Sequence, residues 1–461
     1  MSIFRNILLN LPEVQGPTQK RLPFKEKLKW TGIMLGLFFL LGMIPLFGLD
    51  PQNEFRFEQL EIILGAKFGS IISLGIGPLV TASIVLQLLT GAGILKFDLT
   101  KTEDKAMFQG LQKAASIFFI LFEGFIYVFM GGLTPPQNLA GTSIYFTLQL
   151  LLVAQLFIGG FLIMFMDEVV SKWGFGSGIS LFIAAGVSKE IFIKAFSWLP
   201  SPSNPNVMTG RIPAMLQALS SGSPDALLSA LLMGAAVIAT VLVFVMAVYG
   251  QAMKVEIPLS FGRVRGHGVR WPLNFIYTSN IPVILVSAFL ANLQLWARLM
   301  ENWGVKAILG KSISGMVAYL DAPNIVGLAI TGSLTGSHIA QALVYMLLMV
   351  GGSVLFSIFW VQTSGMDAAS QAKNMMSSGL HIPGFRKDQR ILERLLSRYI
   401  WPLTVMGAIF VGFLAAVADL AGALSRGTGI LLAVMIIYKL YEDIARQHMM
   451  DMHPVLKRFM Q

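Results

Sequence analysis

The sequence predicts an all-α polytopic membrane protein, with ten transmembrane helices in two pseudo-symmetric inverted halves of five. Three observations support this fold class. The chain is 55% hydrophobic and 13% charged, with a mean hydropathy of +0.70 over 461 residues, a composition typical of proteins that cross a bilayer many times. Its apolar residues gather in ten separate stretches, and its Lys and Arg residues gather in alternate segments between them.

The ten apolar stretches are close to the length of a transmembrane helix, which needs about 20 mostly apolar residues. They are residues 30–49, 70–95, 108–131, 143–166, 175–195, 227–250, 272–297, 339–362, 400–418 and 427–441. The segment before the first stretch is too long and too polar for a signal peptide, so we expect it to be retained. The chain has no cysteine, which excludes disulfides and thiolate metal sites.

The distribution of Lys and Arg predicts the orientation, because short basic loops stay on the cytoplasmic side of a membrane. The basic residues concentrate in residues 20–29, 96–113, 263–270, 386–398 and 446–458, which share one side if the chain crosses ten times. An even number of crossings also places both termini on that side. We therefore expect the N- and C-termini to be cytoplasmic.

A run of helix-breaking residues, 73–81, interrupts the second apolar stretch. No charged residue lies between Lys67 and Lys96, so the Gly and Pro residues of this run interrupt or start a helix within the membrane. A broken helix at this depth usually lines a cavity. Residues 54–68 read as a short helix tucked in from the outer side, and residues 313–336 as a re-entrant or surface loop. An ordinary external loop is the alternative for each.

A polar, Ser- and Pro-rich segment divides the ten stretches five and five. We interpret residues 1–196 as an N-terminal half, 197–226 as an external connector and 227–461 as a C-terminal half, with cytoplasmic loops near 254–271 and 365–399. An odd number of spans in each half inverts one half relative to the other, an arrangement that places sites between two moving units. This symmetry rests on the span count, because no clear residue-level repeat accompanies it.

The sequence carries no recognisable catalytic or metal-binding motif. There is no HExxH pair and no GxSxG serine, and the segment from Gly304 to Ser312 lacks the spacing of a phosphate-binding loop. We therefore expect neither enzymatic activity nor a cofactor nor a metal. Glu123 is the clear charge within a predicted span, where it costs at least ~2.5 kcal/mol unless it faces the bundle interior. One acid gives little basis for an ion-coupled secondary transporter of small solutes, which remains the alternative to a passive pathway.

Six short motifs occur in order along nearly the whole chain. They are LPFKEK at 22–27, LGIGP to LQLL at 74–89, GSGISLFI at 176–183, YTSNIPVI at 277–284, IPGFR at 382–386 and GTGILL at 427–432. Together they resemble the SecY family, the large subunit of the Sec protein-conducting channel. IPGFR and the VEIPLS segment at 255–260 resemble the archaeal form of that family.

The resemblance implies a central hourglass pore with a closed neck and a plug. The ring of aliphatic side chains at the neck maps to Ile76, Val80, Ile179, Ile183, Ile284 and Leu432. Within it, Ile76 with Val80 and Ile179 with Ile183 are i,i+4 pairs, so the two residues of each pair share one helix face. Such pairs alone are usually ordinary packing residues between helices, so the ring assignment rests on the resemblance. The plug maps to the helix at 54–68, with Leu60, Ile63, Leu64 and Phe68 nearest the pore.

The resemblance also implies a lateral gate, a set of partners and a location. The gate is a seam between the second and third spans on one side and the seventh and eighth on the other, with a polar cluster of Thr81, Glu123 and Asn280.

Basic residues of the cytoplasmic loops would bind the ribosome and its RNA; these are Arg263, Arg265, Arg270, Arg386, Lys387 and Arg390. Expected partners are two small single-span subunits (gamma/SecE-like and beta-like) in a heterotrimer, signal sequences, nascent polypeptides and the lipid bilayer. The implied function is passage of unfolded secretory polypeptides across the cell (plasma) membrane and lateral release of transmembrane segments.

Overall fold

The computed structural model of the chain describes residues 10–18, 22–50, 69–91, 94–95, 97, 102–130, 132–201, 204–220, 226–261, 268–278, 281–302, 307–308, 311–312, 319–377, 380–381 and 388–452. Within these ranges, one helix occupies each of the ten predicted positions. The ten are α2 (Phe24–Leu41), α4 (Gly77–Gly91), α5 (Thr102–Phe129), α6 (Ser143–Trp173), α7 (Gly178–Phe196), α9 (Ala226–Ala252), α10 (Ile281–Asn302), α13 (Gly336–Thr363), α15 (Gln389–Leu420) and α16 (Gly427–Met452).

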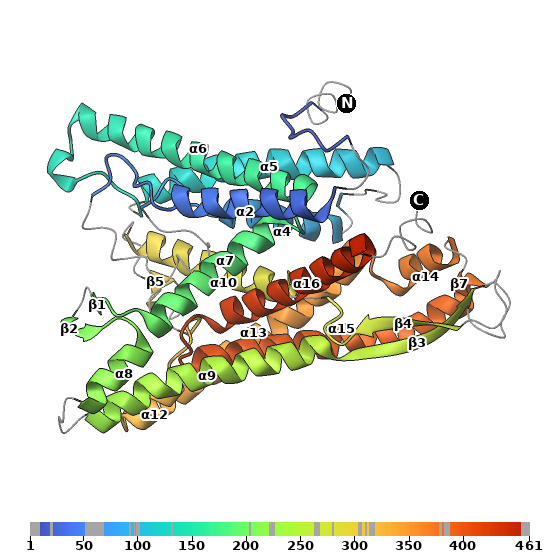
Figure 1. Ribbon diagram of the computed structural model, residues 1–461. Helices are drawn as coiled ribbons and strands as arrows, with labels where there is room; N and C mark the ends of the chain where they lie inside the picture. Colours follow the sequence, from blue (N-terminus) through green and yellow to red (C-terminus); the bar gives the residue numbers. More distant parts are fainter. Residues whose placement is uncertain are drawn as a thin grey trace.

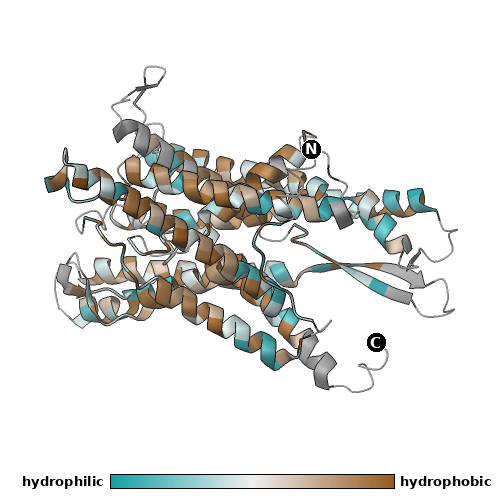
Figure 2. Cartoon of the chain, turned by 90° about the horizontal axis from the view of Figure 1, so that it is seen from above, coloured by the Kyte–Doolittle hydropathy of each residue, from teal (hydrophilic) through white to brown (hydrophobic). Residues whose placement is uncertain are grey.

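The hydropathy of these helices is that of a membrane-spanning bundle. Among the described helices, α5, α6, α9, α13 and α15 are each long and apolar enough to cross a bilayer by length and composition. Figure 2 shows hydrophobic residues along the middle of the bundle and hydrophilic residues toward its two ends. The helix α4 has 15 residues, or about 22 Å at 1.5 Å per residue, which is shorter than the ~30 Å hydrocarbon core.

The remaining elements lie in the connections. They are the 3₁₀ turn η2 (Gln137–Leu139), the helices α8 (Arg211–Ser220), α12 (Ile325–Ile330) and α14 (Ala368–Ser377), and the strands β1 (Pro200–Ser201), β2 (Asn204–Met208), β3 (Lys254–Phe261), β4 (Gly268–Asn274), β5 (Ala307–Ile308), β6 (Lys311–Ser312) and β7 (Leu380–His381). Within the segment predicted as a re-entrant or surface loop, residues 313–336, the structure describes the short helix α12 followed by exposed residues.

The bundle has two distinct ends (Figure 1). The start of α2, the end of α16 and the strands β3, β4 and β7 lie at one end, which we call the termini end, whereas β1, β2, α8 and α12 lie at the far end. The helices α2, α5 and α6 lie on one side of the bundle and α9, α13 and α15 on the other. The helices α7 and α16 run in opposite directions between these groups and pack against each other.

Several predicted boundaries are wrong, among them those of the first, seventh and ninth spans. The first helix spans Phe24–Leu41 rather than 30–49, because Gly42 caps it and the Pro45 that follows pairs with Ser70 in an isolated bridge. Residues 272–280 are not helical where the structure describes them, because β4 continues to Asn274. The helix α15 begins at Gln389 rather than near 400, so residues 389–399 are helical.

The early start of α15 has a clear physical cause. Its first three turns are amphipathic, with Leu392, Leu396 and Ile400 buried at i,i+4 spacing and charged residues on the exposed face. They pack with Ile257 and Leu273 of β3 and β4 in an apolar cluster at the termini end. A hydropathy window does not detect such a helix, because its mean hydropathy is low while one face is apolar.

Candidate functional site

An apolar neck lies where the two halves meet. All six predicted ring residues belong to one hydrophobic cluster or pack against it: Ile76, Ile183 and Leu432 are buried, and Val80, Ile179 and Ile284 are half-buried at its edge. They come from the turn before α4 and from α4, α7, α10 and α16. The structure thus brings together six residues that are spread over more than 350 positions of sequence.

A left-handed turn delivers the first ring residue to this neck. Residues 71–76 form turns, Gly75 has φ +54°, and α4 begins at Gly77, so the predicted break in the second span is confirmed. The left-handed conformation at Gly75 is one that residues with a Cβ rarely adopt. The turn packs closely against α6 at Gly159, where a Cβ would overlap the Ile71 carbonyl.

A half-buried carboxylate holds the start of α7. Ser177 is the N-cap residue of α7, but its side chain makes no capping hydrogen bond. Asp167 of α6 takes that role instead: its Oδ1 accepts a hydrogen bond from the Ile179 amide at 2.9 Å and lies 3.5 Å from the Ser177 hydroxyl. The first amides of a helix need such acceptors because no helical carbonyl precedes them.

The start of α16 is held in the same way. Asp419, near the end of α15, accepts a hydrogen bond from the Gly427 amide at 2.6 Å, and its other oxygen accepts one from the Tyr345 hydroxyl at 2.6 Å. Sequence reasoning missed both Asp167 and Asp419. The available signal was the pair of motifs GSGI at 176–179 and GTGI at 427–430, a short residue-level repeat at the starts of the fifth and tenth spans.

Polar and apolar groups line the predicted lateral seam. Thr81 of α4 donates its hydroxyl to the Gly77 carbonyl at 3.0 Å and lies within hydrogen-bonding reach of the Glu123 carboxyl of α5. Asn280 lies outside the described residues. The helix α4 packs against α10 and α13, with Ile84 buried among residues of the other half. The sequence did not reveal the contact of Ile84 across the seam. Nor did it reveal the 2.7 Å hydrogen bond from Gln112 to Ser83, which joins α5 to α4 within one wall.

The two predicted basic loops share one small sheet. Strand β3 pairs with β4 along its length and with β7, through Ser260 opposite His381. The Tyr277 hydroxyl donates to the Met366 carbonyl at 2.7 Å, and burial followed by the Asp367 carboxylate raises the pKa of Tyr277 to about 12. Arg270 and Arg390 are exposed at this end of the molecule. Arg263, Arg265, Arg386 and Lys387 lie outside the described residues, as do the predicted plug residues Leu60, Ile63, Leu64 and Phe68.

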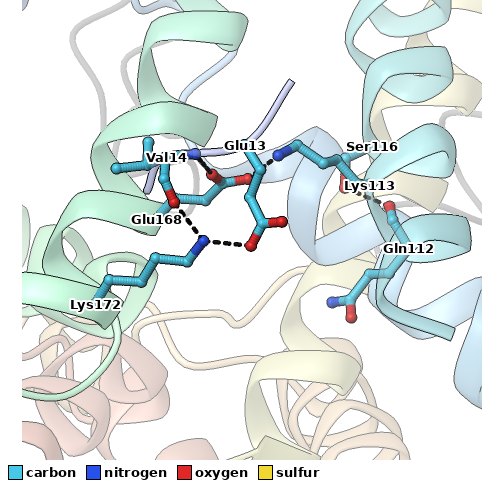
Figure 3. A network of polar contacts seen from close by, with 7 residues as sticks. All are labelled: Glu13, Val14, Gln112, Lys113, Ser116, Glu168 and Lys172. Carbon is cyan, nitrogen blue, oxygen red and sulfur yellow. Dashed lines mark hydrogen bonds and ion pairs between the residues drawn. The ribbon is translucent and has the colours of Figure 1, made fainter. Parts of the chain in front are cut away.

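The chain before α2 is tied to the end of α6 (Figure 3). Residues 10–18, which we call the N-terminal strap, lie across α6: Glu13 pairs with Lys172, the Val14 amide donates to Glu168 at 2.9 Å, and Glu168 also pairs with Lys113 of α5. The hydrogen bond and charge of Lys172 hold the pKa of Glu13 below its usual value, against a smaller effect of burial. The last two turns of α6 therefore anchor α5, α7 and the strap together.

Comparisons with known proteins agree with this architecture. The SecY family model matches residues 70–441. The protein translocase subunit SecY of Methanothermobacter thermautotrophicus is 45% identical over 468 residues, covering 99% of this chain and 98% of the relative. A solved structure described as a protein conducting channel matches with a TM-score of 0.80 at 40% identity, over 97% of this chain and 98% of that one. Sec61 in a canine ribosome–channel complex from the endoplasmic reticulum matches with a TM-score of 0.78 at 39% identity, over 97% and 98% of the two chains.

Proposed function

The chain belongs to the SecY family, and from this premise we propose that its apolar neck is the constriction of the channel. The protein is the pore-forming subunit of a protein translocation channel and is not an enzyme; it passes unfolded secretory polypeptides across the membrane and releases transmembrane segments laterally into lipid. The reported matches give no support to the secondary-transporter alternative.

The observation that carries the proposal for the neck is the convergence of six aliphatic side chains from four separate segments in one cluster. An aliphatic constriction excludes water and ions by dewetting, yet it forms no strong bond with a polypeptide that passes through it. In the resting protein, the buried side chains of Ile76, Ile183 and Leu432 would close the path. Residues 54–68 would act as a plug on the outer side.

Lateral release would take place where α4 and α5 meet α10 and α13. This seam is supported by the polar pair of Thr81 and Glu123 on one wall and by the apolar contact of Ile84 across it. Hydrogen bonds between membrane helices contribute about 0.6 to 2 kcal/mol each, which is weak enough for a gate to open. The inverted halves of residues 1–196 and 227–461, joined by 197–226, would move against each other to open it.

The termini end would face the cytoplasm of the cell and would bind the ribosome. Its sheet carries the exposed Arg270, and α15 begins with the exposed Arg390 beside it. Arginine suits phosphate groups because its planar guanidinium binds them with two parallel hydrogen bonds. Small single-span subunits would complete a heterotrimer in the plasma membrane, with both termini of this chain cytoplasmic. The Sec61 relative in a ribosome–channel complex supports the ribosomal partner.

A leak measurement tests the neck. The full chain is reconstituted in lipid vesicles, and the rate of ion flux is compared between the native protein and Ile183→Ser. We expect the variant to leak at least about tenfold faster, because a hydroxyl in the constriction favours its wetting. Ile163→Ser is the matched control, since Ile163 is buried in the same cluster on α6 but is not a ring residue. Equal leaks from the two variants would contradict the proposal.

A further inference from the structure

Two helices of the neck, α7 and α16, share one arrangement at their first turns. Each of α7 and α16 begins with a glycine pressed against the preceding helix. A Cβ at Gly178 would lie 2.6 Å from the Asp167 Cα, and a Cβ at Gly427 would overlap the Ala415 carbonyl of α15. Each helix start is also held by an aspartate of that preceding helix. The two starts are therefore fixed by matched contacts, one in each half.

The positions of the ring residues explain why this matters. Ile179 donates the amide that Asp167 accepts, Ile183 follows one turn later, and Leu432 lies five residues after Gly427. At 1.5 Å per residue, all three lie within about 8 Å of a capped helix start along the helix axis. A small shift or unwinding of either first turn therefore moves ring residues directly.

The two carboxylates are connected differently to the rest of the protein. Asp167 precedes Glu168, which binds the N-terminal strap and Lys113 of α5. Asp419 also accepts the hydrogen bond of Tyr345 from α13, a helix of the proposed seam. The position of the start of α7 thus depends on contacts with α5 and α6. The position of the start of α16 depends on contacts with α13 and α15.

We propose that Asp167 and Asp419 are positioning residues, one in each half, which hold the first turns of α7 and α16 so that Ile179, Ile183 and Leu432 stay in register at the neck. A carboxylate is suited to this task because it accepts hydrogen bonds from the unpaired amides of a helix start and complements the positive end of the helix dipole. The inference rests on the proposed role of the neck as the seal of the channel.

Leak measurements on the reconstituted full chain test the inference. We expect Asp167→Ala and Asp419→Ala each to raise the resting ion leak by about tenfold. Loss of one charge-assisted hydrogen bond changes the ratio of the sealed to the leaking state by about this factor. Asp167→Asn and Asp419→Asn keep an acceptor oxygen and should leak much less than the Ala variants. Thr335→Ala is the matched control, because Thr335 caps α13, a helix without a ring residue, and it should leave the leak unchanged.

A second measurement reports helix position without relying on the leak. The chain has no native cysteine, so the rate of disulfide formation between Ile183→Cys and Leu432→Cys is measured without competing thiols. We expect its rate of formation to change by at least about threefold in the presence of Asp167→Ala and to stay unchanged with Thr335→Ala. This assay works in membranes even where an Ala variant is too unstable to purify.

The outcomes separate the inference from the function on which it rests. One outcome is that Ile183→Ser leaks while Asp167→Ala and Asp419→Ala seal and crosslink as the native protein does. In that case the positioning role of the aspartates is wrong, and the sealing role of the neck is retained. If Ile183→Ser does not leak, the sealing role of the neck fails, and the crosslinking rate still decides whether the aspartates hold the helices. Leaks of equal size from Thr335→Ala and Asp167→Ala would reduce the aspartates to ordinary stabilising caps and would overturn the inference.

Discussion

The ion pair between Lys113 and Glu168 links α5, a wall of the proposed seam, to α6. The exposed fractions of the two side chains are 12% and 18%. Removing one partner of a buried pair costs about 3 to 5 kcal/mol, and breaking an exposed pair costs about 0 to 1 kcal/mol. Because Glu168 keeps the Val14 amide as a donor, we expect Lys113→Met to cost about 2 to 3 kcal/mol.

The neighbouring pair provides a matched comparison. Lys172 pairs with Glu13, whose side chain is 65% exposed, so Lys172→Met should cost less than about 1 kcal/mol. For a chain of this length, the entropy of unfolding converts the larger loss into a fall of about 2 to 3 °C in the midpoint of thermal unfolding. The assay is intrinsic tryptophan fluorescence of the purified protein, scanned at one heating rate for all variants.

A double variant tests whether the cost arises from an unpaired charge. Lys113→Met with Glu168→Gln removes both charges of the pair and keeps an acceptor for the Val14 amide. We therefore expect the double variant to unfold at a higher temperature than Lys113→Met alone. Equal midpoints for Lys113→Met and Lys172→Met, or additive losses in the double variant, would refute the reasoning.

Three further predictions concern the channel itself. Glu123→Leu should change the hydrophobicity at which a test segment enters the bilayer, measured by glycosylation or protease protection; an unaltered threshold would count against the seam. Deletion of the plug segment, residues 54–68, should raise the resting ion leak of reconstituted vesicles, and an unchanged leak would contradict the assignment of the plug. Arg270→Ala with Arg390→Ala should weaken ribosome binding and reduce its dependence on salt concentration, because each lost phosphate contact lowers that slope by about one; an unchanged slope would exclude these two residues from the interface.

The span positions could be predicted from the sequence because bilayer thickness sets the length of an apolar helix. The exceptions have physical causes. The start of α15 is amphipathic, with Leu392, Leu396 and Ile400 on its one apolar face, so mean hydropathy does not detect it. The first helix was placed too late because apolar residues such as Met43 and Phe47 continue beyond it into an exposed turn.

The neck could be predicted only through the family resemblance. Ile76, Ile183 and Leu432 are ordinary aliphatic residues of apolar helices, and nothing in their local sequence indicates that they converge. Asp167 and Asp419 were missed for a related reason: each is an acid near the end of an apolar stretch, where an interfacial position is the usual interpretation. Their role depends on a helix start that lies eight to twelve residues further along the chain.

The central claim is that a polypeptide passes through the neck, and site-specific photo-crosslinking tests it most directly. A photoreactive residue at Ile183 is exposed to a ribosome-tethered, stalled secretory chain, with a stalled cytosolic chain of equal length as the control. We expect the secretory chain alone to be captured at Ile183. Absence of capture in a complex that is demonstrably docked would contradict the account and would mean that the six aliphatic side chains only pack against one another.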